Sequence, residues 1–160
     1  MDELSFEHQK QGALTQIVSG TILAFDFGAK RIGVAVGNTI AQTSQPLITL
    51  HGEQNEKRFA AIAALIGEWQ PVALVVGLPC NEDGSSHEMT HLCRRFARRL
   101  KGRFELPAIL VDERYTSATA SMQLNEMGVR GIKQKSKIDQ VAAQHILQAY
   151  FDEPTVAQLA

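Results

Sequence analysis

The chain has 160 residues and a mass of 17.6 kDa, which is the size of one ordinary domain. Because 44% of its residues are apolar, one core is enough to stabilise it, which excludes a small scaffold held together by disulfides or a structural metal. The net charge is −1, but the charges are unevenly distributed along the chain. Residues 94–137 carry 11 Lys and Arg against 4 Asp and Glu. This local excess of positive charge favours a polyanionic partner such as nucleic acid.

The chain is expected to begin with a flexible N-terminal arm over residues 1–20. Asp2, Glu3 and Glu7 stand where a secretion signal would have a basic region followed by an apolar stretch, so the arm does not predict export. No apolar run approaches the roughly 20 residues that a membrane span needs. We therefore expect a cytoplasmic protein with no membrane partner.

Short, β-branched apolar runs after the arm predict five strands. They cover residues 21–27, 31–36, 46–50, 72–78 and 107–111. The first two runs are so close together that they fit only an antiparallel hairpin. The first and fourth are apolar at nearly every position, which is typical of strands that are covered on both faces.

Apolar residues at helical spacing predict four helices between and after these strands. They cover 53–69, a stretch beginning at a capping box of Ser85 and Glu88, 116–127, and 136–150, with a basic loop at 128–135 before the last one. Cys80 and Cys93 lack the spacing of a zinc site or a redox pair, and we interpret them as ordinary reduced thiols.

This order of elements predicts an α/β fold: a five-stranded mixed sheet with helices on both faces, as in the ribonuclease H-like fold. The domain is expected to span residues 21–152, followed by a C-terminal tail at 153–160. The last helix would turn its apolar residues to the sheet and leave Gln140, Gln144 and Gln148 on the side facing solvent.

Acidic residues stand at three places in the chain where an apolar core disfavours charge. Asp26 is the single charge in the first strand, and it would either cap the turn that follows or meet a cation. Asp139 falls on the apolar arc of the last helix, although Ser136 three residues earlier also permits an N-terminal capping interpretation. Asp112 and Glu113 close the fifth strand, and strand alternation turns one of them toward Asp26.

If three such carboxylates converge at the carboxyl edge of the sheet, their repulsion requires a divalent cation among them. Hard oxygen ligands select Mg²⁺ or Mn²⁺, and the chemistry that such a site performs is phosphodiester hydrolysis. The helix that begins at Ser85 carries Arg94, Arg95, Arg98 and Arg99 away from its apolar face. That face would either bind nucleic acid or simply be solvated.

Four motifs in this order resemble the YqgF family of bacterial ribonuclease H-like proteins. They are FDFGAKRIGV at 25–34, VGLP at 76–79 followed by DGS at 83–85, VDERYTS at 111–117 and KSKIDQVAA at 135–143. Members are described as Holliday-junction resolvases and as nucleases that mature the 5′ end of 16S rRNA. The resemblance extends over about residues 20–151.

The resemblance implies specific site residues. It makes Asp26, Glu113 (rather than Asp112) and Asp139 the catalytic, metal-binding carboxylates for Mg²⁺ or Mn²⁺. It also implies contacts with the phosphate backbone, made by the side chains of Lys30, Arg31, Arg114 and Lys137.

The function that we expect is that of a metal-dependent endonuclease processing the 5′ end of the 16S rRNA precursor, free or in a ribosomal precursor particle. The alternative substrate is a four-way DNA junction, which a homodimer rather than a monomer would match in symmetry. Two weaker hypotheses are a nucleotide-binding phosphotransfer enzyme and a non-catalytic RNA-binding assembly factor.

Overall fold

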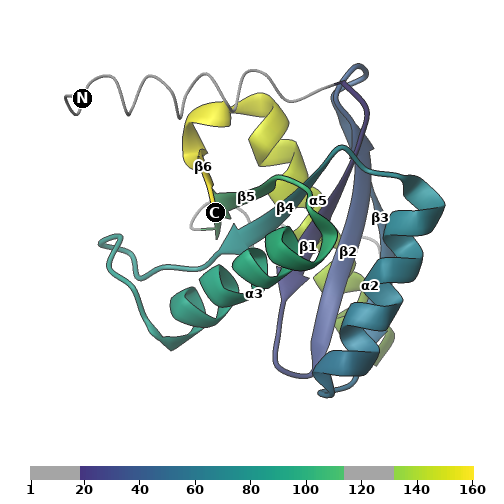
Figure 1. Ribbon diagram of the computed structural model, residues 1–160. Coiled ribbons are helices and arrows are strands. Elements are labelled where there is room, and N and C mark those ends of the chain that lie inside the picture. Colours follow the sequence, from purple (N-terminus) through teal and green to yellow (C-terminus); the bar gives the residue numbers. More distant parts are fainter. Residues whose placement is uncertain (1–18, 114–131) are drawn as a thin grey trace.

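One mixed sheet forms the centre of the computed structural model, which describes residues 19–113 and 132–160 (Figure 1). Its elements in chain order are β1 (Thr21–Phe27), β2 (Arg31–Asn38), β3 (Thr43–His51), α2 (Asn55–Trp69), β4 (Ala73–Leu78), α3 (Glu88–Phe104), β5 (Ala108–Asp112), α5 (Ile132–Asp152), the 3-10 turn η2 (Pro154–Val156) and β6 (Ala157–Leu159). The predicted arm, the helix predicted over 116–127 and Arg114 lie outside the described residues, apart from positions 19 and 20.

The strands lie in the order β3-β2-β1-β4-β5-β6. β1 pairs in parallel with β4, and β4 in parallel with β5, whereas the pairs β1–β2, β2–β3 and β5–β6 are antiparallel. The carboxyl ends of β1, β4 and β5 therefore meet at one edge of the sheet. In open α/β sheets this edge is where binding sites form.

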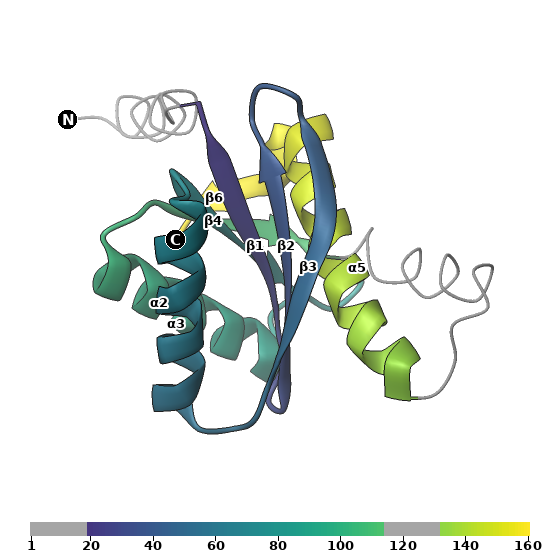
Figure 2. The same ribbon diagram turned by 90° about the vertical axis from the view of Figure 1, so that its right-hand side faces the viewer.

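Helices cover both faces of the sheet, with α2 and α3 on one side and α5 on the other (Figure 2). Leu23 and Phe25 of β1 belong to the core beneath α2 and α3, while Ile22 and Ala24 belong to the core beneath α5. Because side chains alternate along a strand, Asp26 belongs to the α5 face and Phe27 to the opposite face. Within the described ranges, no helix is long and apolar enough to cross a membrane.

The sheet has a sixth strand, where five were predicted. β6 lies in the segment expected to be a tail and pairs with β5 through Ile109↔Leu159 and Val111↔Ala157. It has three residues only, so its pattern is too short to be recognised from the sequence. The unpaired edge of β5 supplies the hydrogen-bonding groups that order it.

The predicted beginning of the second helix at Ser85 is wrong, since α3 begins at Glu88. The hydroxyl and the backbone N–H of Ser85 both donate to Asp83 Oδ1, at 2.6 and 2.8 Å, so Ser85 closes a turn in the preceding loop. The backbone N–H of His87 donates to Thr90 Oγ1 at 3.0 Å and begins the helix instead. A serine near a helix start stabilises a turn as readily as a cap, so the sequence pattern did not separate the two.

The last helix also departs from its prediction. Because α5 already includes Ile132, residues 132–135 are helical rather than part of a basic loop, and Asp139 lies beyond the first turn. The capping interpretation of Asp139 is therefore wrong. Gln140 and Gln144, predicted to face solvent, donate instead to Thr49 Oγ1 at 3.1 Å and to the carbonyl of Ser44 at 3.0 Å, both on β3.

Candidate active site

Asp26 lies at the carboxyl end of β1, on the face that α5 covers. Its side chain is hydrogen-bonded to that of Glu113. The pKa of Asp26 is raised well above its usual value, mainly by burial. The charge of Glu113, the hydrogen bond with Glu113 and the charge of Asp139 raise it further. Two carboxyl groups hydrogen-bond to each other only when one is protonated, and these shifts place the proton on Asp26, which donates to Glu113.

Glu113 follows β5 directly and belongs to the α5 face, two residues after Val111 of the same core. Asp112 has the opposite orientation and lines a separate pocket with Leu78 and Arg94. Burial raises the pKa of Glu113, and the negative charge of Asp112 adds to this effect, while the hydrogen bond from Asp26 opposes it. Of the two consecutive acids, Glu113 is therefore the one that the fold brings to Asp26.

Gly77 of β4 makes room for the Glu113 carboxylate and was not identified from the sequence. A Cβ atom at Gly77 would overlap Glu113 Oε1 and come within 2.5 Å of Ile146 Cδ1. The absent side chain thus leaves the space between β1 and β5 in which the carboxylate lies. The signal in the sequence was a glycine inside an otherwise apolar strand, which often marks a close approach.

Replacing Gly77 with Ala is expected to destabilise the protein by about 1–3 kcal/mol, because Glu113 and Ile146 must both move to accept the methyl group. Gly102→Ala in α3 is the control, since a Cβ there meets no atom within 4 Å. Urea unfolding of the two variants tests the expectation. Equal unfolding midpoints for Gly77→Ala and Gly102→Ala would show that the Glu113 side chain moves aside with no loss of stability.

Asp139 is held near this pair by α5. Its carboxylate Oδ2 accepts a hydrogen bond from Arg31 Nε at 2.7 Å, and the two side chains are 19% and 37% exposed, respectively. α5 approaches β2 so closely at Gly33 that a Cβ there would overlap the Asp139 carbonyl. Because Gly33 pairs with Asp26 across the β1–β2 ladder, this contact brings Asp139 alongside Asp26.

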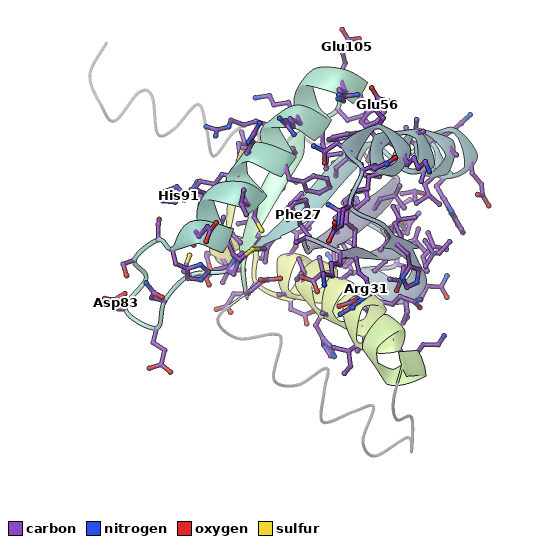
Figure 3. All side chains as sticks on the ribbon, turned by 90° about the horizontal axis from the view of Figure 1, so that it is seen from below. Phe27, Arg31, Glu56, Asp83, His91 and Glu105 are labelled. Carbon is purple, nitrogen blue, oxygen red and sulfur yellow. The ribbon has the colours of Figure 1, made fainter. Side chains whose placement is uncertain are left out.

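One pocket at the end of the sheet contains two of the three acids. It is lined by Asp26, Phe27, Gly28, Ala29, Lys30, Arg31 and Asp139. Seen from below, Phe27 and Arg31 lie at this end between α3 on one side and α5 on the other (Figure 3). Lys30 is exposed in the β1–β2 turn, and Lys137 is exposed on α5.

The donor set suits a hard divalent cation, because Asp26 and Glu113 place carboxylate oxygens side by side. In the part of the chain that the structure describes, however, no three His, Cys, Asp or Glu side chains are grouped closely enough to hold an ion jointly. Asp139 is instead turned toward Arg31. A site of three carboxylates would therefore require Asp139 to leave Arg31.

Arg58 is a second residue that sequence reasoning missed. It projects from α2, is only 5% exposed, and donates through Nη2 to the carbonyls of Gly28 and, at 2.8 Å, Ala29. Its guanidinium also lies 5.4 Å from the centre of the Phe27 ring. Arg58 therefore fixes the β1–β2 turn next to Asp26, and its position on the apolar stripe of the helix was the available signal.

Cys93 of α3 is buried in the core on the opposite face of the sheet from α5. Burial, with smaller contributions from the charges of Glu113 and Asp26, raises its pKa to about 12. Cys80 and Cys93 are both free, and Cys80 is only half-buried.

At pH 8 we expect a thiol reagent to modify Cys80 and leave Cys93 intact until the protein unfolds, because a buried neutral thiol is a poor nucleophile. Mass spectrometry of the labelled peptides measures this. Cys80→Ala should leave no fast-reacting thiol, and equal labelling of both cysteines in the native protein would contradict the burial of Cys93.

Comparisons with known proteins agree with this arrangement. Residues 20–153 match the family model described as "RuvX: Holliday junction resolvase". The chain is 62% identical over 133 residues to a protein of Methylobacillus flagellatus (83% of this chain, 91% of that protein) and 54% identical over 141 residues to one of Nitrosomonas eutropha (88% and 90%). Both carry the name "Putative pre-16S rRNA nuclease".

Among solved structures, T. thermophilus RuvC in complex with Holliday junction substrate superposes with a TM-score of 0.53 at 11% identity, covering 88% of this chain and 99% of that one. A second T. thermophilus RuvC structure gives the same TM-score at 9% identity. The likeness confirms the ribonuclease H-like fold that was predicted, with six strands instead of five. Since the family match extends over most of the chain and the relatives are more than half identical, this protein belongs to the RuvX (YqgF) family.

Proposed function

We propose that the protein is a divalent-metal-dependent endonuclease that cleaves the 16S rRNA precursor at its 5′ end. The observation that carries the proposal is the contact of Asp26 with Glu113 at the carboxyl edge of the sheet, with Asp139 beside them. A merely structural sheet gains nothing from a pair of buried acids, because their desolvation is costly. The name of the relatives from Methylobacillus flagellatus and Nitrosomonas eutropha supports the choice of substrate.

Asp26 and Glu113 are the residues that would hold Mg²⁺ or Mn²⁺, with Asp139 as the third ligand. The ion supplies an activated water and stabilisation of the leaving oxyanion when it is bound. The carboxylates do not attack phosphorus themselves. Asp26 must lose its proton before it serves as a ligand. The raised pKa of Asp26 opposes that loss, so metal binding should become more favourable as the pH increases.

The basic residues around the pocket would position the substrate. Lys30 at the tip of the β1–β2 turn and Lys137 on α5 are exposed and free to reach phosphate groups, and Arg114 is proposed for the same role. Arg31 pairs with Asp139, and its guanidinium would be available to a phosphate if the Asp139 carboxylate were a ligand of the ion. Such contacts position a nucleic acid without reading its sequence.

A cleavage assay tests the proposal directly. The purified protein is incubated with a labelled precursor 16S rRNA fragment and with a synthetic four-way DNA junction, each with Mg²⁺, Mn²⁺ or EDTA. Cleavage of the RNA that stops in EDTA is the expected result. An RNA that stays intact with both metal ions contradicts the proposal.

The two acids at the end of β5 provide a matched pair of variants. Glu113→Gln is expected to lower the cleavage rate at least about 100-fold, because a metal ligand supplies several kcal/mol of transition-state stabilisation. Asp112→Asn, the control, should change the rate only a few-fold, since Asp112 lies on the other face of the strand. Cleavage rates of both variants are measured at saturating Mg²⁺. A larger loss of rate for Asp112→Asn than for Glu113→Gln would make Asp112 the metal ligand instead of Glu113.

The second candidate substrate is a four-way DNA junction, which the description of the matching family favours. A resolvase acting on this substrate works as a two-fold symmetric dimer, since the junction itself has that symmetry. Paired nicks at symmetric positions together with a dimer in solution would support the junction. Cleavage of the RNA fragment by a monomer supports the first candidate.

A further inference from the structure

A groove separate from the carboxylates lies between α2 and α3, on the opposite face of the sheet. It is lined by Phe27, Asn55, Arg58, Phe59, Leu92, Arg95, Phe96 and Arg99. Three of these residues are arginines and three are phenylalanines, and no acidic residue is among them. We call it the arginine groove.

The arginines of α3 are arranged along one stripe of the helix. Arg95 and Arg99 are four residues apart, and Arg103 continues the stripe by four more, so the three side chains lie one above another. Like charges at this spacing destabilise a helix. In the described ranges, the ion pair that forms is Arg31–Asp139, and none joins an acid to the groove arginines. The stripe therefore has no ion-paired acid among the described residues, although Glu53 attracts the neighbouring Arg58 of the groove.

The aromatic rings orient the guanidinium groups and leave little room for a base. Arg103 lies over the Phe59 ring at 4.2 Å from its centre, and Arg58 lies over the Phe27 ring at 5.4 Å. Phe59 and Phe96 are only 5% and 4% exposed, so their faces are not open for stacking. An apolar floor with guanidinium walls suits phosphate groups, which arginine recognises through its planar fork of donors.

The arginine groove adjoins the candidate active site at Phe27. Phe27 lines both the groove and the pocket that contains Asp26 and Asp139. The turn between them carries the exposed Lys30 and is bonded from the groove side by Arg58. Viewed from below, Phe27 lies between α3 and the end of the sheet where Arg31 is found (Figure 3).

We propose that the arginine groove binds the phosphodiester backbone of the nucleic-acid strand that extends beyond the cleavage site. The strand would leave the carboxylates, pass over Lys30 and continue along Arg95 and Arg99. This inference rests on the proposed nuclease function and adds the path of the substrate. Binding there depends on charge and is blind to base sequence, because every nucleotide offers the same phosphate.

The test compares two double variants of one helix that remove the same charge. Arg95→Ala with Arg99→Ala empties the groove wall, whereas Arg98→Ala with Lys101→Ala removes two charges from other positions of α3. Binding of a fluorescein-labelled RNA hairpin with a single-stranded extension, and of a DNA hairpin of the same sequence, is measured by anisotropy in EDTA over a range of KCl concentrations. Urea unfolding checks that both variants are folded.

In a plot of log affinity against log salt concentration, the slope of the groove variant is expected to be shallower than that of the parent by about 1.4–1.8. Each of the two lost phosphate contacts removes roughly 0.7–0.9 from the slope. The control pair should keep the parent slope, and Arg95→Lys with Arg99→Lys should keep most of it, which guards against a groove variant that misfolds. An equal loss in both alanine pairs would overturn the groove in favour of diffuse charge. A loss confined to RNA would also overturn it, because both hairpins share the phosphates.

These outcomes are distinguishable from failure of the nuclease proposal, because binding in EDTA requires no cleavage. A protein that shows the groove-dependent slope but cuts neither substrate would keep the groove and lose the nuclease. If the parent cuts RNA and the groove variant keeps the parent's salt-dependence slope, the nuclease proposal stands and the groove proposal fails.

Discussion

Asp26→Asn is expected to lower metal-dependent cleavage at least about 100-fold and, in the absence of divalent ions, to make the folded protein more stable at neutral pH. The first effect follows because an amide replaces an anionic ligand. The second follows because the parent buries Asp26 against Glu113 and Asp139, all of them acidic. Asparagine keeps the size of the side chain and can still donate a hydrogen bond to Glu113.

The pH dependence of the gain has a definite sign. Burial and the neighbouring acids raise the pKa of Asp26 in the folded state, so the folded protein keeps a proton that the unfolded chain has released. The stability that this proton provides is fully present below the unfolded pKa of about 4 and is lost as the pH rises through the folded pKa. Asp26→Asn should therefore match the parent near pH 4 and exceed it at pH 7.

Urea unfolding in EDTA across this pH range measures the gain, and a cleavage assay of the same samples in Mg²⁺ measures the loss of rate. Adding Mg²⁺ should raise the unfolding midpoint of the parent more than that of the variant, because only the parent offers both carboxylates. A variant that cleaves as fast as the parent would remove Asp26 from the mechanism. A variant that is less stable at pH 7 would show that the buried acids do not repel each other.

Gly33→Ala is expected to cost roughly 3 kcal/mol of stability, close to the upper end for an overpacked core position. A Cβ atom at Gly33 would overlap the backbone carbonyl of Asp139 and lie 2.9 Å from its Cβ. Backbone atoms of a helix do not move aside singly, so α5 must lift from β2 as a unit. Because α5 packs on β1, β2 and β3, and carries Asp139, the change should disturb the core and the site together.

Urea unfolding of Gly33→Ala, with Gly67→Ala in α2 as control, tests this expectation. A Cβ at Gly67 meets no atom within 4 Å, and alanine favours a helix over glycine by about 1 kcal/mol, so the control should be neutral or slightly stabilised. A Gly33→Ala protein as stable as the parent would mean that α5 does not depend on the close approach at this position.

The pattern of polarity along single elements was sufficient to predict most of the fold. β1 and β4 are apolar at almost every position, and this follows from their central places in the sheet, where both faces are covered. Asp26 was recognisable as a candidate because an unpaired charge in such an apolar strand is costly to bury. Properties that depend on one element and its exposure to solvent can thus be predicted from the local sequence.

The features that position the site come from contacts between elements distant in the chain. Gly77 matters through Glu113, Gly33 through Asp139, and Arg58 through the carbonyls of the β1–β2 turn. β6 forms because β5 offers it an open edge, and Gln140 bonds to β3 because α5 lies across that strand.

The sequence by itself therefore determined the order of β1 to β5 and of α2, α3 and α5 along the chain, and it identified the acids that are candidates for the site. Whether Asp139 points to Asp26 or to Arg31, and which neighbours each acid meets, was decided only by the tertiary structure. The physical reason is that hydrophobic periodicity specifies which face of an element is buried. The spacing of side chains from different elements depends on how closely their backbones pack, and that packing is a property of the whole domain.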